Sequence, residues 1–146
     1  MPDKSLIGRS LGVTRTEVEK GRLRFFAKAI GETDPVYTDE AAAQAAGHPS
    51  LPVPPSFLMC LECEGRDSDH IVEDIFGFDL GRILHAEQGF VYHRLAYAGD
   101  RLTFDTRVVD VYEKKGGALT FVVQETRVTN QRGEHVADIR SSLVQR

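Results

Sequence analysis

Four long segments in the second half of the chain have the alternating apolar pattern of β-strands, and this feature constrains the fold most strongly. Short breaks with glycine and polar residues, which favour turns, lie at 98–100 (AGD), 115–117 (KGG) and 130–134 (NQRGE). The predicted strands are residues 83–94, 102–113, 118–129 and 135–145. Strands joined by such turns form an antiparallel meander.

Within the last two segments the apolar residues share one face. They are Leu119, Phe121 and Val123 in the third segment and Ala137, Ile139 and Leu143 in the fourth. Across Val108 and Val109 the alternation changes phase, which predicts a β-bulge or a sharp bend in the second segment.

The first half of the chain has helical periodicity and many turn signals. An extended segment is expected from Arg9 to Thr14, and the capping-box pattern TEVE at residues 16–19 predicts a helix start. Gly31 is expected to end this helix, because glycine accepts the left-handed cap conformation. The stripe that runs along it consists of Val18, Arg22, Phe25, Phe26, Ala29 and Ile30.

A second short helix is expected from Asp39 to Ala46, with Thr38 as its cap and Gly47 at its end. Prolines then exclude regular structure until Pro55, which suits a first helical turn. Residues 57–61 are apolar on all sides, which predicts a buried helix. Residues 66–82 are interpreted as a connecting insertion.

This order of elements predicts an α+β fold in which a curved antiparallel sheet wraps around one apolar helix, with a helical overhang before it. The length of 146 residues fits a single domain that covers residues 1–146. A sheet of this kind leaves free edges, and such an edge often pairs with a second chain. We therefore expect a dimer.

Composition excludes several classes of function. The formal net charge is -4, so the chain has no general attraction to nucleic acid or anionic lipid. It contains no long apolar run that would insert into a membrane, and its first ten residues show no secretion signal. We expect a cytoplasmic protein whose two cysteines are thiols.

One candidate for proton chemistry is the turn GETDPVY at residues 31–37. A carboxylate and a second proton carrier in one cleft can act as an acid–base pair. Glu32 and Tyr37 are five positions apart across a proline turn, so both side chains could enter one pocket. The alternative is a helix stop and turn in which Glu32 faces solvent and Asp34-Pro35 is a common turn dipeptide.

Other candidates have equally simple alternatives. His85 and Glu87 are predicted on one face of the first strand, either lining a cleft or facing solvent, and His93 extends this polar row. Cys60 and Cys63 form C-x-x-C, but a zinc site needs further ligands, so we interpret them as packing residues and expect no metal.

Two stretches carry a resemblance to a known family: FFAKAIGETDPVYTDEAAAQAAGHPSLPVPPSFL and LHAEQGFVYHRLAYAGDRLTFDTRVVDVYEKKGGALTFVVQE. The sequence resembles the MaoC-like dehydratases, and more narrowly the group called the N-terminal half of MaoC dehydratase. The resemblance runs from about Arg9 to Val144. It implies a hot-dog fold in which residues 16–53 overhang the central helix and shape an acyl pocket.

Members of that family add water to trans-2-enoyl thioesters of coenzyme A or acyl carrier protein, or remove it from R-3-hydroxyacyl thioesters. Their motif is D-x-N-P-x-H, whose aspartate and histidine activate the catalytic water. Here Glu32 stands at the aspartate position, Asp34 at the asparagine, and Tyr37 at the histidine. His85 is the candidate that could replace the histidine.

The resemblance therefore implies three catalytic residues, Glu32, Tyr37 and His85. It also implies five substrate contacts, at Asp34, Pro55, Ser56, Phe57 and Glu87. No cofactor is expected beyond the acyl-CoA or acyl carrier protein substrate.

Three functions are compatible with this altered motif. The chain could be a hydro-lyase, an enoyl-CoA hydratase or dehydratase of fatty acid metabolism, acting as a homodimer. It could be a non-catalytic acyl-binding subunit in a heterodimer with a MaoC-type catalytic subunit. It could also be an acyl-CoA thioesterase, since hot-dog folds host that chemistry too.

Overall fold

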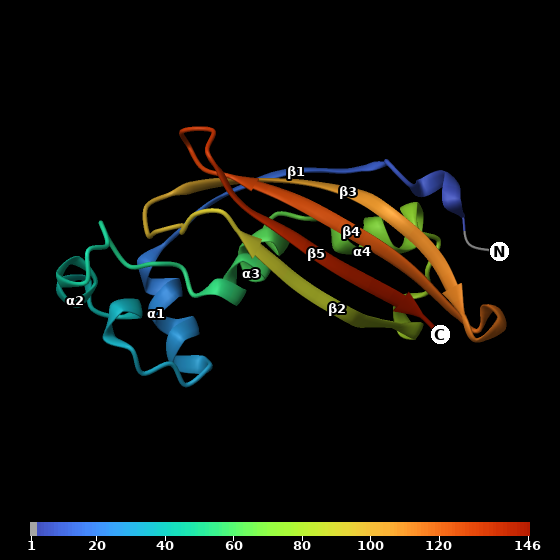
Figure 1. Cartoon of the computed structure of the whole chain (residues 1–146). Helices are drawn as coiled ribbons and strands as arrows, with labels where there is room; N and C mark the ends of the chain where they lie inside the picture. The colour runs from blue at the N-terminus through green and yellow to red at the C-terminus, as the bar shows by residue number, and fades with distance from the viewer. Residues whose placement is uncertain (1–2) are drawn as a thin grey trace.

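The structure is a computed structural model that describes residues 3–146. Five antiparallel strands form one curved sheet in the order β1-β3-β4-β5-β2 (Figure 1). They are β1 (Ser10–Glu17), β2 (Ile83–Tyr92), β3 (Arg101–Lys114), β4 (Leu119–Thr129) and β5 (His135–Gln145). The four predicted strands are confirmed, with small shifts at their ends, and so is the α+β class. The predicted meander holds for β3, β4 and β5, but β2 pairs with β5 and not with β3.

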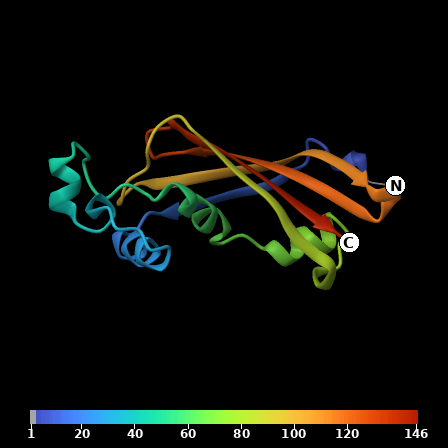
Figure 2. The ribbon, with the colours of Figure 1, turned by 60° about the horizontal axis from the view of Figure 1, so that its bottom comes forward.

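Helices cover one side of this sheet and extend beyond its end (Figure 2). They are α1 (Lys20–Ala29), α2 (Glu40–Ala45), α3 (Leu58–Cys63) and α4 (Ser68–His70). Short 3₁₀ or π turns lie at Lys4–Leu6, Pro35–Tyr37, Pro55–Phe57, Ile71–Ile75, Leu80–Arg82 and Lys115–Gly117. The predicted overhang consists of α1 and α2, which lie past the end of the sheet (Figure 1).

The layer against the concave face of the sheet comes in two pieces. The predicted buried helix is α3, where Leu58 and Leu61 are fully buried; each contributes about 2 kcal/mol of hydrophobic stabilisation. Gly65, with φ +71°, then breaks the helix. The chain continues in α4 and the π turn, where Ile71 and Val72 are buried. The segment predicted as a connection is thus the second half of this layer.

Each piece has its own apolar cluster. The first joins α3 and α1 to the sheet through residues such as Leu23, Leu58, Leu61, Phe104 and Ile139. The second joins the π turn and the segment after it to the sheet through Ile71, Val72, Phe76, Val108 and Val122. Polar side chains lie between the two clusters, at Thr106 of β3 and Gln124 of β4, and both are buried.

Two local predictions in the overhang are wrong. The chain does not start a helix at TEVE, because residues 16 and 17 still pair with β3 and the Thr16 hydroxyl donates to the Leu61 carbonyl at 3.3 Å. The α1 face that packs inward carries Leu23 and Ala27, whereas Phe25 is 77% exposed. Sheet pairing and tertiary contacts override the local capping pattern here.

The predicted helix end at Gly31 and the predicted bulge are confirmed, but the predicted cap of α2 at Thr38 is wrong. Gly31 ends α1 with φ +73°. Residue 39 rather than residue 38 caps α2, through a bond from Ala41 N–H to the Asp39 carboxylate at 2.9 Å. The predicted bulge in β3 is confirmed by a register shift between Val108 and Asp110.

Candidate active site

The turn after α1 is built around two carboxylates. Glu32 Oε1 accepts hydrogen bonds from the backbone N–H groups of Thr33 and Asp34, both at 2.9 Å. Asp34 caps the 3₁₀ turn Pro35–Tyr37 by accepting from the N–H two residues further on, at 3.1 Å. One oxygen of each carboxylate is therefore engaged in holding the turn.

Tyr37 ends this turn near a second tyrosine, Tyr92, at the end of β2. The Tyr92 hydroxyl donates to the Pro55 carbonyl at 2.6 Å. Burial raises the pKa of Tyr37, and the negative charges of Glu32 and Asp34 raise it further. Burial also raises the pKa of Tyr92 strongly, and Tyr37 adds to this effect. Both phenols stay protonated at neutral pH and can donate a proton but not act as a general base.

The three residues predicted as substrate contacts at the central helix have different environments. Pro55 opens the turn that leads into α3, as predicted, and its carbonyl is already bonded to Tyr92. Ser56 is exposed. Phe57 is buried, and its ring packs on Phe26 with centroids 4.7 Å apart. The candidate site therefore groups the start of α3 with Tyr37, Tyr92 and the turn after α1.

The structure does not bring His85 to this group within one chain. His85 and Tyr92 are seven residues apart on the same strand, which corresponds to about 23 Å. A bulge between His85 and Glu87 also shifts the alternation of β2, so the predicted common face of these two residues is wrong. His85 Nε2 lies 2.9 Å from the Glu87 carbonyl oxygen.

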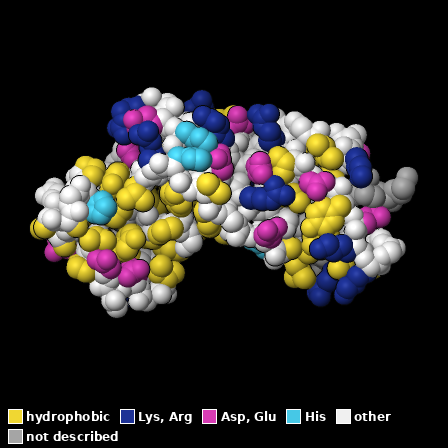
Figure 3. All heavy atoms as spheres, in the orientation of Figure 1, with side chains coloured by type: hydrophobic (Ala, Val, Ile, Leu, Met, Phe, Trp, Pro, Cys, Tyr) yellow, Lys and Arg dark blue, Asp and Glu magenta, His cyan; other side chains and the backbone are white. Residues whose placement is uncertain are grey.

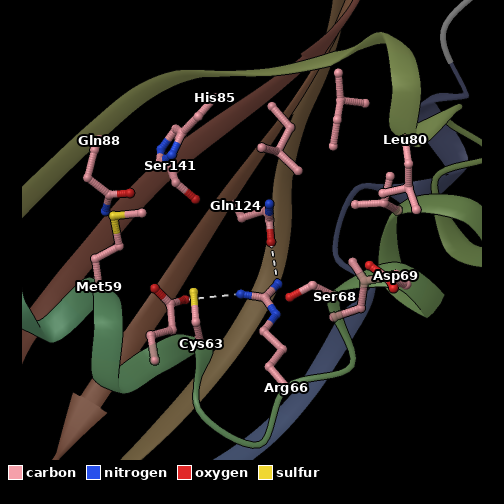
Figure 4. Close-up of a pocket in the computed structure, with 15 residues that line it drawn as sticks. Met59, Cys63, Arg66, Ser68, Asp69, Leu80, His85, Gln88, Gln124 and Ser141 are labelled. Atoms are coloured by element: carbon pink, nitrogen blue, oxygen red, sulfur yellow. Dashed lines mark hydrogen bonds and ion pairs between the residues drawn. The ribbon is translucent and has the colours of Figure 1, made fainter.

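His85 instead lines a cavity of about 320 Å³ between the concave face of the sheet and the two helical pieces (Figure 4). Apolar side chains form much of its wall: Met59, Ile71, Val72, Leu80, Ile83 and Leu143. Gln88 projects into the cavity from β2. Its Nε2 is buried and has no hydrogen-bond partner among residues 3–146, so it is a donor available to a ligand.

A buried ion pair forms one end of this cavity. Glu62 is 5% exposed, and its Oε1 lies 3.3 Å from an Arg66 guanidinium nitrogen. The Thr126 hydroxyl donates to the same carboxylate oxygen. The second terminal nitrogen of the Arg66 guanidinium donates to the Gln124 side-chain carbonyl (Figure 4). Each charge thus has partners, which buried charges require.

The thiol of Cys63 also lines the cavity. Burial raises its pKa, and the Glu62 carboxylate raises it further, against the opposing effect of Arg66. It is therefore a protonated thiol at neutral pH and a weak nucleophile. Cys60 and Cys63 are free, and in the described part of the chain they belong to no group of three metal-binding side chains.

Sequence reasoning missed two features of this region. Phe90 and Tyr92 alternate as on an apolar strand face, and nothing in this pattern indicates that the Tyr92 hydroxyl bonds to the turn at Pro55, although a buried tyrosine needs a partner for its hydroxyl. Glu62 and Arg66 have the i,i+4 spacing of a helix ion pair, but nothing in the sequence indicated that they would be buried. Within residues 3–146, no helix is both long and apolar enough to cross a membrane.

Comparison with known proteins gives consistent matches over nearly the whole chain. Residues 5–139 match the model of the family described as "FAS1-like, dehydratase domain region". A UPF0336 protein of Saccharopolyspora erythraea is 38% identical over 99% of this chain and 91% of that protein.

Two solved structures are similar in fold. One is the C-terminally truncated HadBC (3R-hydroxyacyl-ACP dehydratase) complex of Mycobacterium tuberculosis, with 26% identity, coverage of 92% of this chain and 96% of that chain, and a TM-score of 0.71. The other is the MaoC-like dehydratase of Rhodospirillum rubrum, with 20% identity, coverage of 99% and 96%, and a TM-score of 0.73.

Proposed function

Because the chain belongs to the family of the FAS1-like dehydratase domain region and has the hot-dog fold of the MaoC-like dehydratases, we propose that it is the acyl-binding subunit of a heteromeric dehydratase or hydratase. It would bind an R-3-hydroxyacyl or trans-2-enoyl thioester of coenzyme A or acyl carrier protein in the cytoplasm. A MaoC-type partner subunit would supply the acid–base pair.

The observation that carries this proposal is the proton state of the candidate site. Hydration needs a general base near pH 7. Tyr37, at the position of the family histidine, keeps its proton, and one oxygen of Glu32 is held by the turn. The nearest predicted substitute, His85, lies about 23 Å along β2 from Tyr92. The chain therefore lacks the aspartate–histidine pair of the D-x-N-P-x-H motif that the resemblance implies for active family members.

The cavity supports the binding half of the proposal. Its apolar wall suits an acyl chain, since each methylene transferred from water contributes about 0.8 kcal/mol. The free donor of Gln88 suits an oxygen of the ligand. The solved complex with 26% identity is itself a heteromeric 3R-hydroxyacyl-ACP dehydratase, which supports a partner subunit of the same fold.

The test is an assay of crotonyl-CoA hydration with the purified chain alone and with a co-expressed MaoC-type subunit that carries an intact D-x-N-P-x-H. We expect no turnover from the folded chain alone and turnover from the pair. The chain alone should still bind a longer saturated acyl-CoA, and calorimetry measures this binding.

If the chain alone turned over crotonyl-CoA and Glu32→Gln abolished this activity, the protein would be a self-sufficient hydratase and the proposal would be wrong. Release of free thiol from acyl-CoA would instead identify a thioesterase. If the partner subunit turned over the substrate equally well without this chain, this chain would have no role in the reaction.

A further inference from the structure

Three metal-binding side chains meet where the end of β2 lies against the start of β5. His93 Nε2 is 2.9 Å from one oxygen of Asp138, and His135 Nε2 is 2.7 Å from the other. All three ligand atoms lie within 4.8 Å of one another. Among residues 3–146 this is the one group of three histidine, cysteine or acidic residues that meets this criterion.

A bulge at the start of β5 explains how the fold builds this group. His135 and Asp138 are three residues apart, which would put them on opposite faces of a regular strand. The register between β4 and β5 shifts here, and Val136 and Ala137 are both fully buried. The chain gains one residue at this point, so His135 and Asp138 both point away from the core.

The neighbouring strand completes the group. Both His93 and Arg94 donate backbone hydrogen bonds to the Val136 carbonyl, at 2.8 and 3.2 Å. This contact fixes the end of β2 against the bulge and holds the two imidazole rings with centroids 4.2 Å apart. Figure 3 shows histidine side chains at the surface near the β4–β5 hairpin, among charged residues.

We propose that His93, His135 and Asp138 form a binding site for a divalent transition-metal ion of the zinc type. The donor set of two imidazoles and one carboxylate matches zinc sites with three protein ligands and one water. Imidazole nitrogen favours zinc, cobalt or nickel over magnesium and calcium, which prefer oxygen ligands.

The two observed nitrogen–oxygen distances need only a small adjustment. Tetrahedral zinc has bonds of about 2.0–2.2 Å to nitrogen and oxygen, which separates adjacent ligand atoms by roughly 3.3 Å. The two nitrogen–oxygen distances, 2.9 and 2.7 Å, would widen slightly as the ion replaced the hydrogen bonds. All three side chains are partly exposed, so an ion and a water molecule can reach them.

Two arginines near the site are paired with one carboxylate, whereas Arg127 of β4 lies opposite Asp138 in the sheet register. Arg94 lies 2.7 Å from one oxygen of Glu134, and Arg132 lies 2.9 Å from the other. The carboxylate therefore offsets part of the arginine charge that would otherwise repel a cation. A bound ion would join the end of the edge strand β2, which carries Tyr92, to β5.

Zinc binding to the untagged, full-length chain tests this site, with calorimetry for affinity and the visible absorption spectrum of the cobalt derivative for geometry. We expect about one equivalent of metal, a cobalt spectrum of low coordination number with histidine ligands, and a higher Tm with zinc. His135→Gln and Asp138→Asn should each weaken binding by roughly tenfold or more.

His70→Gln is a matched control, because His70 also pairs with a carboxylate, Asp74, at 2.7 Å, but belongs to no such group of three. It should bind zinc as the unmodified chain does. Undetectable zinc binding by the unmodified chain, or equal loss in His70→Gln and Asp138→Asn, would overturn the proposal. Circular dichroism of each variant verifies that it is folded.

Discussion

Tyr37 and Tyr92 determine which proton chemistry the candidate site can perform. Both phenols have pKa values raised by burial, and for Tyr37 two nearby carboxylates raise it further. A group with a raised pKa in the folded state stabilises the fold while it is protonated. This stabilisation is fully present below pH 10, the usual pKa of tyrosine, and is lost as the pH rises above it.

We predict that two of the four tyrosines ionise late in the folded chain. An alkaline titration followed by tyrosinate absorbance should show fewer ionised tyrosines just above pH 10 in folded than in urea-unfolded protein. Tyr92→Phe should remove one late-ionising group. Identical folded and unfolded titration curves would contradict the burial of these phenols.

Glu32 allows a test that separates a structural from a catalytic role. Its carboxylate accepts two backbone hydrogen bonds, which Gln can partly replace and Ala cannot. We predict that Glu32→Ala lowers the Tm by about 2–4 °C and that Glu32→Gln changes it less. In the complex with an active partner, Glu32→Gln should keep near-normal turnover. A large loss of turnover in a Glu32→Gln complex of unchanged Tm would make Glu32 catalytic.

The break between α3 and α4 gives the molecule its cavity. A continuous helix would fill the space that Gly65 and the following loop leave open, and the buried pair Glu62–Arg66 lies at this break. Apolar clusters lie on both sides of the pair. The pair therefore separates the two halves of the core and forms the polar end of the cavity.

Removing one member of this pair should be costly. We predict that Arg66→Ala destabilises the chain by about 3 kcal/mol, because Glu62 then stays buried without its cation. Equilibrium urea unfolding measures the change. The double variant Glu62→Gln/Arg66→Met should recover much of the loss, because it leaves no unpaired charge. If Arg66→Ala were as stable as the parent chain, water would have to solvate the Glu62 carboxylate, and the pair would not be buried.

The cavity wall can be tested without touching the candidate site. Ser141 lines the cavity from β5, and its replacement by Leu adds volume there. We predict that Ser141→Leu weakens the binding of long acyl-CoA by roughly tenfold, because the larger side chain displaces part of the acyl group from the cavity. The binding of short acyl-CoA should be unchanged. Calorimetric titration with both ligands gives the comparison. Equal weakening of both would place the acyl chain elsewhere.

Elements were predictable where one local signal and the tertiary contacts agree. Alternating apolar residues and glycine-rich turns predicted four strands, because the sheet uses the same alternation. The TEVE pattern failed, because pairing of Thr16 with β3 outweighs a local cap. The cavity was not predictable, since it depends on contacts between Gln124 of β4 and Arg66, far apart in sequence.

The candidate site shows the same division. The motif resemblance located Glu32 and Tyr37, which lie close in sequence and in space. It could not place His85, because a bulge between His85 and Glu87 shifts the alternation of the strand. The group His93, His135 and Asp138 was equally hidden, since it depends on a bulge and on pairing between two strands.

The sheet as a whole has two edges, and they differ in character. β2 is the longer edge strand, with Leu84 and Val91 exposed, and it carries Tyr92 of the candidate site. β1, at the other edge, is shorter and carries the charged residues Arg15 and Glu17. Charged edges resist pairing with another chain. A partner subunit that extended the sheet through β2 would also approach the candidate site.

We therefore predict that Val91→Lys disrupts the complex with a MaoC-type partner, weakening it by tenfold or more. Val91 is 60% exposed, so a lysine there should not unfold the chain, but it would place a charge in the new interface. Val13→Lys is the matched control, since Val13 is 48% exposed on β1. Native mass spectrometry and size-exclusion chromatography measure assembly, and turnover should fall in parallel. If Val13→Lys dissociated the complex and Val91→Lys did not, the partner would pair with β1. A partner on β1 would not approach the candidate site through β2, and the predicted sheet extension through β2 would be wrong.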